Sequence, residues 1–240
     1  MSNIQNLCDD IVNWLKDRVN ESGTKGLVFG LSGGIDSAVV AALAKKAFPN
    51  NALGVIMPCH SNPEDEEHAR LVANTLDLET VKVDLTNVYD VFLEQLESSD
   101  NVLAKSNIKP RLRMTTLYYY AQIRRYLVTG TSNKSEFTVG YFTKYGDSGV
   151  DILPIVDLVK EEVYELAKYL NIPEIIINKP PTAGLWENQT DEKEMGFTYK
   201  ELDRYIKTGE ASDFIKDKID TMYNRSEHKR RMPLMYIRKE

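Results

Sequence analysis

The segment from residue 27 to residue 37 reads Leu27-Val28-Phe29-Gly30-Leu31-Ser32-Gly33-Gly34-Ile35-Asp36-Ser37. Its first three residues form a short apolar run with β propensity, and a helix-like stretch at 38–48 follows its end. A strand, a glycine-containing turn and a helix in this order are typical of one unit of an α/β sheet.

The rest of the chain repeats this alternation. Apolar runs predict further strands at 52–57, 80–85 and 126–129, and apolar residues at helical spacing predict helices at 4–19, 63–76, 87–97, 110–126 and 158–170. Strands that alternate with helices predict an α/β protein with a doubly wound parallel sheet and flanking helices on both faces.

The later part of the chain is less regular. Residues 179–197 hold several prolines and glycines with little apolar periodicity, which predicts a functional lid or a disordered loop. The last forty residues read as polar helices that end in the basic patch 228–231. Since no repeat or linker interrupts the chain, we expect a single domain over 1–240.

Composition narrows the class of protein. The 240 residues carry 30 Lys and Arg against 36 Asp and Glu, a net charge of −6, which gives no support to a nucleic-acid-binding surface. Cys8 and Cys59 form neither a zinc motif nor a disulfide framework. With no signal peptide and no apolar run that could span a membrane, we expect a cytoplasmic protein without nucleic-acid or membrane partners.

The glycine-containing turn suits phosphate binding. Gly33 and Gly34 would let a phosphate approach main-chain N–H groups at the start of a helix, where the helix dipole adds partial positive charge. Ser32 and Ser37 add hydroxyl donors. The carboxylate of Asp36 would repel phosphates unless a cation such as Mg²⁺ lay between them. The turn lacks the Lys-Ser/Thr of a Walker A sequence and the spacing of a GxGxxG motif. The alternative to phosphate binding is that it is an ordinary tight turn between a strand and a helix.

A second polar cluster, Gly130 to Glu136, follows the strand predicted at 126–129. Ligands of open α/β sheets bind at such carboxyl ends of strands. Thr131 could hydrogen-bond a nucleotide, and Glu136 could be a second carboxylate on Mg²⁺. The alternative is a polar turn with Glu136 in the first turn of a helix.

Several motifs resemble a known family. The string Ser32–Ser37 (SGGIDS) resembles the PP-loop of the ATP pyrophosphatases, whose fold is Rossmann-like, of the adenine nucleotide alpha hydrolase type. The strings at 107–114 (NIKPRLRM), 142–154 (FTKYGDSGVDILP) and 179–192 (KPPTAGLWENQTDE) resemble the ammonia-dependent NAD synthetases within that superfamily. The likeness covers roughly residues 4–232.

The resemblance implies an ATP-dependent ligase that amidates deamido-NAD with ammonia through an adenylated carboxylate. Because a glutaminase domain would need a nucleophilic cysteine and many more residues, we expect none here and expect free ammonia to be used, unless a separate glutaminase subunit supplies it. The resemblance also implies Mg²⁺, a homodimer with the dinucleotide site near the subunit interface, and the following roles. ATP would be bound by Gly30, Leu31, Ser32, Gly33, Gly34, Ile35, Asp36, Ser37, Thr131, Lys160 and Thr182; Mg²⁺ by Asp36 and Glu136; deamido-NAD by Arg111, Lys144, Asp151, His228 and Lys229; and catalysis would involve Asp147 and Lys160.

One departure from the family pattern is Pro110, beside Arg111, which leaves Arg113 as a second candidate for that contact. Plainer alternatives also stand. Lys160 could be a solvated residue on its helix, and Cys59 a nucleophile or a structural residue. Trp186 could anchor the lid or pack beneath it, and residues 118–120 could belong to helix packing or a dimer face.

Two other functions also stay open at this point. One is a different PP-loop enzyme, such as a GMP synthetase subunit or a tRNA thiolase, and the other is a catalytically silent nucleotide sensor. A thiolase should bring extra cysteines and a basic surface, which this sequence lacks.

Overall fold

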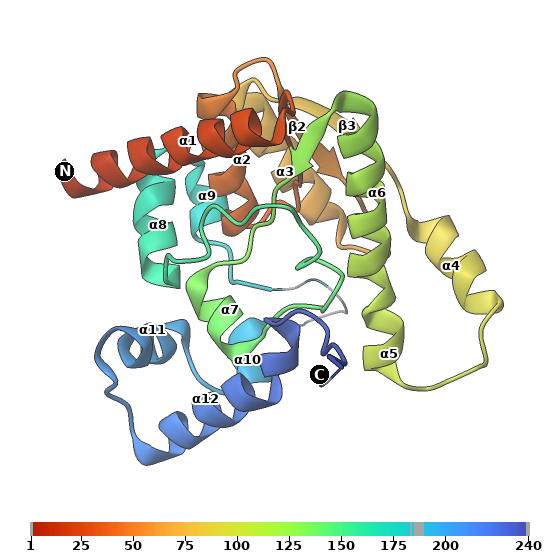
Figure 1. Ribbon diagram of the computed structural model, residues 1–240, viewed down its shortest axis with the longest axis vertical. Helices are drawn as coiled ribbons and strands as arrows, with labels where there is room; N and C mark the ends of the chain where they lie inside the picture. Colours follow the sequence, from red (N-terminus) through yellow and green to blue (C-terminus); the bar gives the residue numbers. More distant parts are fainter. Residues whose placement is uncertain (1, 183, 185–189, 239–240) are drawn as a thin grey trace.

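The computed structural model describes residues 2–182, 184 and 190–238 and contains a four-stranded parallel sheet, in the upper half of Figure 1. Its strands are β1 (Gly26–Gly30), β2 (Ala52–Ile56), β3 (Glu79–Lys82) and β4 (Tyr126–Val128). Their order in the sheet is β3-β2-β1-β4, and all neighbours are parallel. The chain moves outward from β1 through β2 to β3 and then returns to the other side of β1. The order of the strands therefore reverses between β1 and β4, the point at which such sheets bind ligands.

The helices in the described residues are α1 (Ser2–Ser22), α2 (Ile35–Ala47), α3 (Pro63–Leu76), α4 (Thr86–Glu94), α5 (Val102–Ser106), α6 (Ile108–Arg124), α7 (Lys134–Val139), α8 (Lys160–Tyr169), α9 (Glu174–Ile177), α10 (Asp191–Met195), α11 (Tyr199–Thr208) and α12 (Asp213–Arg225), with a 3-10 turn η1 (Glu227–Lys229).

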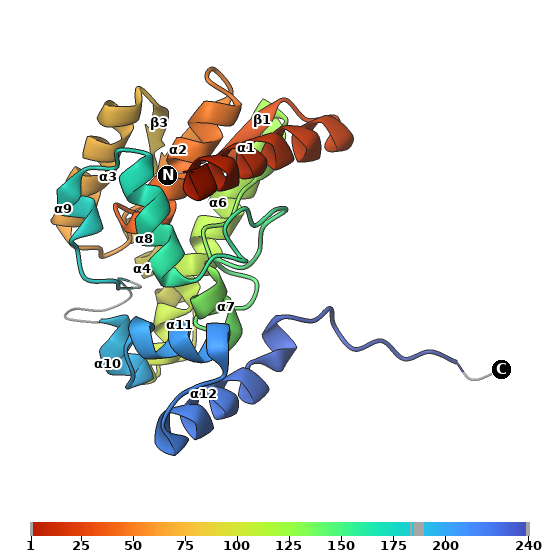
Figure 2. The ribbon, with the colours of Figure 1, turned by 90° about the vertical axis from the view of Figure 1, so that its left-hand side faces the viewer.

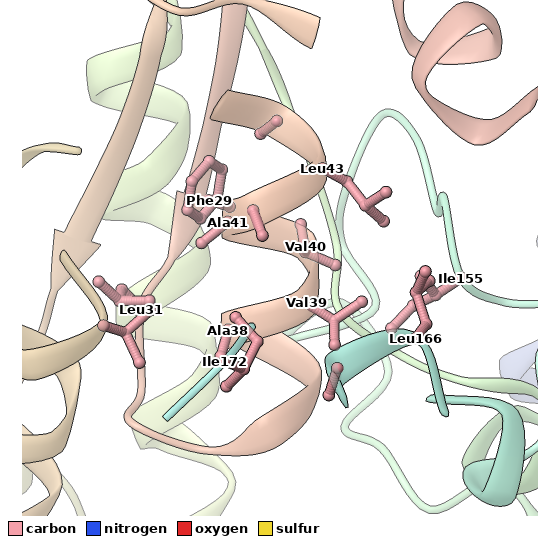
Figure 3. Close-up of a cluster of buried hydrophobic side chains, with 14 of the residues drawn as sticks. Phe29, Leu31, Ala38, Val39, Val40, Ala41, Leu43, Ile155, Leu166 and Ile172 are labelled. Atoms are coloured by element: carbon pink, nitrogen blue, oxygen red, sulfur yellow. The ribbon is translucent and has the colours of Figure 1, made fainter. Parts of the chain in front are cut away.

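Alternating side chains of β1 build a core on each face of the sheet. Leu27 and Phe29 point to the face covered by α1, α2, α3 and α8, where they belong to one apolar cluster with residues of α2 such as Val39 and Ala41. Figure 3 shows part of this cluster. Val28 points to the other face, covered by α4 and α6, and joins a second cluster with Leu117. This period of two is what a strand buried on both faces requires. The predicted α/β class with helices on both faces is confirmed.

A smaller helical layer lies at one end of the molecule, below the sheet in the view of Figure 1. It consists of α7, α10, α11 and α12 around a third apolar cluster that includes Met195, Leu202 and Ile219. The segment after η1 leaves this layer and projects away from the body (Figure 2). The layer brings C-terminal residues to the same region as the carboxyl ends of β1 and β4.

Most predicted elements are present with shifted ends. The third strand stops at Lys82 rather than at residue 85, and the short helices α5 and α9 were not predicted. The prediction that 179–197 has no regular structure of its own is wrong for 191–195, which forms α10 and ends at Gly196 with a φ of 74°. Within that segment, residues 183 and 185–189, and with them the interpretation of Trp186, lie outside the described residues. Among the helices that the structure describes, none has the length and apolarity to cross a bilayer.

Candidate active site

A cavity of about 820 Å³ opens at the carboxyl ends of β1 and β4. Its walls come from the loop after β1, the segment after β4, the first half of α6, the start of α8 and the C-terminal layer. Cavities of roughly 300–1,000 Å³ are typical of small-molecule sites, so this one has room for a nucleotide-sized ligand.

The turn after β1 forms one wall, and its two central glycines have different roles. Gly33 has a φ of 77°, and a Cβ there would collide with the carbonyl oxygen of Asp65 on α3, so glycine is required for packing. Gly34 is the N-cap of α2 and lines the cavity; a Cβ there would meet only Ser32 Oγ, at 3.5 Å. No side chain caps the amides that begin α2, so they are available to an anion.

The hydroxyls of Ser32 and Ser37 brace this turn. The two oxygens are 3.0 Å apart, and Ser37 Oγ donates to the carbonyl of Gly34 at 2.9 Å. Both residues line the cavity, as do Gly30, Leu31, Ile35 and Asp36.

Three charged side chains meet behind the turn. Lys160 Nζ lies 2.6 Å from Asp36 Oδ2 and 3.2 Å from Glu136 Oε1, so one ammonium bridges the two carboxylates. Asn133 Nδ2 donates to Asp36 Oδ1 at 2.9 Å. The Lys160 side chain is only 2% exposed, so the alternative of a solvated lysine is wrong. Asp36 and Glu136, far apart in the sequence, therefore occupy one site.

Burial shapes the ionisation of this cluster. Desolvation, together with the charge of Asp36, raises the pKa of Glu136 to about 8. Burial by itself would lower the pKa of Lys160, but the charges of Asp36 and Glu136 outweigh it and raise the pKa above its ordinary value. Lys160 therefore stays protonated at neutral pH.

Local sequence places each member of the cluster. Glu136 stands at the third position of α7, in a capping box with Asn133, whose backbone N–H donates to Glu136 Oε2 at 3.3 Å. The other oxygen of Glu136 faces Lys160. The two interpretations of Glu136, as a residue in the first turn of a helix and as part of the charged site, are thus compatible.

Asp147, Arg113 and Lys229 also line the cavity. Asp147 Oδ1 accepts from the backbone N–H of Thr143 at 2.8 Å. Desolvation by the protein around it raises the pKa of Asp147, against the opposing effects of that hydrogen bond and of Lys229 and Arg113. Lys229 Nζ donates to the carbonyls of Gly140 and Phe142, both at 2.7 Å, and so ties the C-terminal layer to this wall.

The structure places the remaining predicted site residues in two groups. Thr131 and Thr182 line the cavity. Four others do not belong to its walls as the described residues define them: Arg111, Lys144, Asp151 and His228.

Most of these four have intramolecular contacts instead. Asp151 accepts from the backbone N–H of Val128 at 2.8 Å and from the hydroxyl of Tyr118 at 3.0 Å, which fixes the end of β4. Arg111 donates to the carbonyls of Asn107 and Lys144 at 3.1 and 3.2 Å. Their contacts with a dinucleotide stay predictions.

Three further side chains surround the charged cluster without having been predicted there: Asn133, Asp191 and Tyr199. Asn133 belongs to the polar segment at 130–136, and an Asn three residues before a Glu is a sequence signature of a capping box that could have placed it. Tyr199 donates to Asp191 Oδ2 at 2.9 Å and lies with its ring 4.9 Å from Lys160 Nζ. Nothing local in the C-terminal sequence signals that contact. Cys59 is buried and desolvation raises the pKa of its thiol, which favours the structural alternative.

The reversed strand order, the uncapped glycine turn and the carboxylate pair define a nucleotide-binding α/β enzyme of the PP-loop type. A sequence model described as NAD synthase matches residues 7–233, and the chain belongs to that family.

Individual relatives agree with this assignment. The NH(3)-dependent NAD(+) synthetase of Carboxydothermus hydrogenoformans is 55% identical over 229 residues, which cover 94% of each chain. Among solved structures, NMN synthetase from Francisella tularensis has a TM-score of 0.94 at 40% identity, covering 98% of each chain. NH3-dependent NAD synthetase from Campylobacter jejuni has a TM-score of 0.84 at 32% identity, covering 98% of this chain and 99% of that one.

Proposed function

We propose that the chain is a ligase that amidates deamido-NAD with ammonia, consuming ATP and releasing AMP and pyrophosphate. The observation that carries this proposal is that one cavity is lined both by the glycine turn with the Lys160 cluster and by Asp147 and Lys229. Such an arrangement suits a reaction in which a nucleotide triphosphate must meet a second substrate.

The first step would be adenylation of the nicotinate carboxylate. A carboxylate oxygen forms a bond to the α-phosphorus of ATP, and the bond to pyrophosphate breaks. The amides at the start of α2 and the hydroxyls of Ser32 and Ser37 would hold the phosphates, and Lys160, Thr131 and Thr182 would contact ATP from the facing wall. Preorganised donors stabilise the charge that builds on the leaving pyrophosphate.

The chemistry of the donor set fits Mg²⁺, which prefers one or two carboxylates together with phosphate oxygens. Asp36 and Glu136 would supply the carboxylates, and their shared contact with Lys160 Nζ shows that their oxygens already converge on one cation. When bound, Mg²⁺ would neutralise phosphate charge beside these acidic groups.

The second step would join ammonia to the acyl carbon. Its nitrogen forms the C–N bond and releases one proton to solvent, the bond from carbon to the AMP oxygen breaks, and AMP leaves. Because most ammonia is ammonium at neutral pH, a proton must first be removed. Asp147 lines the cavity with a raised pKa, which makes it a better proton acceptor than an ordinary aspartate.

One assay tests the reaction. Purified chain with ATP, Mg²⁺ and ammonium should form AMP with deamido-NAD and not with xanthosine monophosphate. AMP formation with xanthosine monophosphate instead would favour a GMP synthetase, and no AMP with either acid would favour the nucleotide sensor. Glutamine in place of ammonium should give no product.

A second candidate substrate follows from the similarity to the Francisella NMN synthetase. Nicotinate mononucleotide presents the same carboxylate as deamido-NAD but lacks the adenylyl half. The same assay with both acids, compared by kcat/KM, decides between them. We expect deamido-NAD to be preferred, and a tenfold preference for the mononucleotide would overturn that choice.

We also propose a homodimer. Helices α4 and α5 both contact α6, and large apolar side chains on these three helices and just after α4 are 45% to 63% exposed. We call this set the α4–α6 apolar face: Val88, Val91, Phe92, Leu96, Val102, Leu103, Tyr119 and Ile123. Apolar patches of this kind favour protein contacts. Leu103 also lines the cavity, so a second copy on this face would lie beside the site.

Sedimentation velocity should show a dimer for the natural chain and a monomer for Phe92→Asp. The control is Phe214→Asp, at an exposed position on α12 outside this face. A monomeric natural chain would refute the homodimer. A cytoplasmic location stays a prediction, to be tested by cell fractionation.

A further inference from the structure

Asp203, on α11 in the C-terminal layer, is a buried carboxylate with no part in the proposed chemistry. It is 4% exposed, and both of its oxygens accept hydrogen bonds from the elements that carry the charged cluster. Oδ1 accepts from Ser135 Oγ at 2.5 Å, and Oδ2 accepts from the backbone N–H of Glu161 at 2.8 Å. The Ser135 oxygen in turn accepts from the backbone N–H of Lys160 at 3.1 Å.

These bonds replace a local cap. Helix α8 begins at Lys160, and its N-cap residue is Val159, whose side chain has no acceptor. The first amides of a helix need acceptors, usually from Ser, Thr, Asp or Asn at the N-cap. Asp203 supplies one acceptor directly and a second through Ser135, and its negative charge suits the positive end of the helix dipole.

The same carboxylate also holds α7, because Ser135 precedes Glu136 in that helix. Asp203 thus holds the Lys160 amide through Ser135 Oγ and holds α7 at the residue before Glu136, and the side chains of Lys160 and Glu136 meet at the bridge between Nζ and Oε1. We propose that Asp203 is a positioning residue: it caps α8 from the C-terminal layer and so sets the place of Lys160 between Asp36 and Glu136. This inference rests on the roles proposed for Lys160 and Glu136.

The test is Asp203→Asn, which keeps the volume but sets an amide NH2 against one of the two donors. Displacements of about 1 Å in a catalytic arrangement can cost roughly a hundredfold in rate, so we expect kcat to fall by about 10- to 100-fold. The KM for deamido-NAD should change less than twofold. Hydrogen exchange at the amides of 160 and 161 should speed up.

Tyr205→Phe is the matched control. Tyr205 lies on the same helix and donates to Asp220 Oδ1 on α12 at 2.8 Å, a bond that does not reach α7 or α8. It should keep kcat within twofold even where its melting temperature falls as far as that of Asp203→Asn. Equal kcat values for the two variants, or an unchanged exchange rate at 160 and 161, would overturn the proposal.

Ser135→Ala guards against a variant that fails to fold. It keeps the bond from Asp203 to the Glu161 amide and removes the Ser135 hydroxyl, which bonds both Asp203 Oδ1 and the Lys160 amide. It should lower kcat by about threefold or more. Unchanged kcat would overturn the proposal. Lys160→Met distinguishes a failure of the proposed function from a failure of this inference. Full activity in that variant would refute the role of Lys160 itself. An inactive Lys160→Met together with a fully active Asp203→Asn would refute only the positioning role of Asp203.

Discussion

Replacing Lys160 by methionine should destabilise the fold as well as stop the reaction. The ammonium bridges Asp36 and Glu136 at 2.6 and 3.2 Å, and its side chain is 2% exposed. Removing one partner of a buried ion pair typically costs about 3–5 kcal/mol, because the other charge is left uncompensated. For a chain of this length, that corresponds to a fall in melting temperature of roughly 6–20 °C.

The loss of stability caused by Lys160→Met should be larger at alkaline than at acidic pH. Burial and the charge of Asp36 already raise the pKa of Glu136 to about 8, so the folded state holds that proton more tightly than the unfolded chain does. Stability from this group is therefore present at acidic pH and is lost as the pH rises towards 8. Without the ammonium of Lys160 the pKa of Glu136 should rise further, and the cost of the substitution should be larger at pH 8 than at pH 5.5.

Urea unfolding followed by circular dichroism measures the free energy of unfolding of the natural chain and of Lys160→Met at pH 5.5 and pH 8. The control is Lys207→Met, which removes a bridge to Glu161 at 3.0 Å whose lysine is 39% exposed. Exposed pairs contribute about 0.2–1 kcal/mol, so the control should lose no more than that. The reasoning is refuted if Lys160→Met lies within about 1 kcal/mol of the natural chain at pH 8, or if its loss is larger at pH 5.5.

Three further changes probe separate parts of the site. Gly33→Ala should lower the free energy of unfolding, measured in urea, by about 2–5 kcal/mol, because the alanine would be strained in the left-handed conformation and its Cβ would collide with α3. Gly34→Ala should lower it by less than about 0.5 kcal/mol and should instead raise the KM for ATP. Asp147→Asn should lower kcat/KM for ammonium by about a hundredfold. In the natural chain the rate should fall as the pH drops through the raised pKa of Asp147, and this fall should be absent in the variant. If the variant shows the same fall at acidic pH, Asp147 is not the base. Asp36→Asn should raise the Mg²⁺ concentration needed for half-maximal pyrophosphate release at least tenfold, and a normal Mg²⁺ requirement would contradict the metal assignment.

The sequence predicted those parts of the site that depend on local pattern. The glycine turn, the carboxylate of Asp36 and the polar segment ending at Glu136 each follow a strand that its apolar run reveals. That both strands are neighbours in the sheet is a property of topology. No local signal contains it, and here the resemblance to a family supplied the connection.

Lys160 shows why burial was harder to predict. It begins an amphipathic helix, where a lysine is ordinarily solvated, and only the docking of α11 against α7 and α8 encloses it. Tyr199 and Asp191 belong to the same docking, which depends on the apolar cluster around Met195 and Leu202. Contacts of this kind join segments far apart in the chain and depend on how the helices pack.

The position of the Lys160 ammonium bears on how an acidic site can bind a polyanion. Asp36 and Glu136 stand at the edge of a turn whose amides favour phosphate, and Asp191 lies close enough to raise the pKa of Glu136 further. Burial raises the pKa values of Glu136 and Asp191, and the charge of the neighbouring Asp36 raises both further, so one ammonium does not offset the acidic groups around it. A triphosphate that arrived alone would add negative charge to this excess, whereas one that arrived with a divalent cation would bring the missing positive charge. If the proposed site residues are right, we expect the acidic residues to make the site favour the metal complex of the nucleotide over the free nucleotide, while the amides of α2 would accept any phosphate.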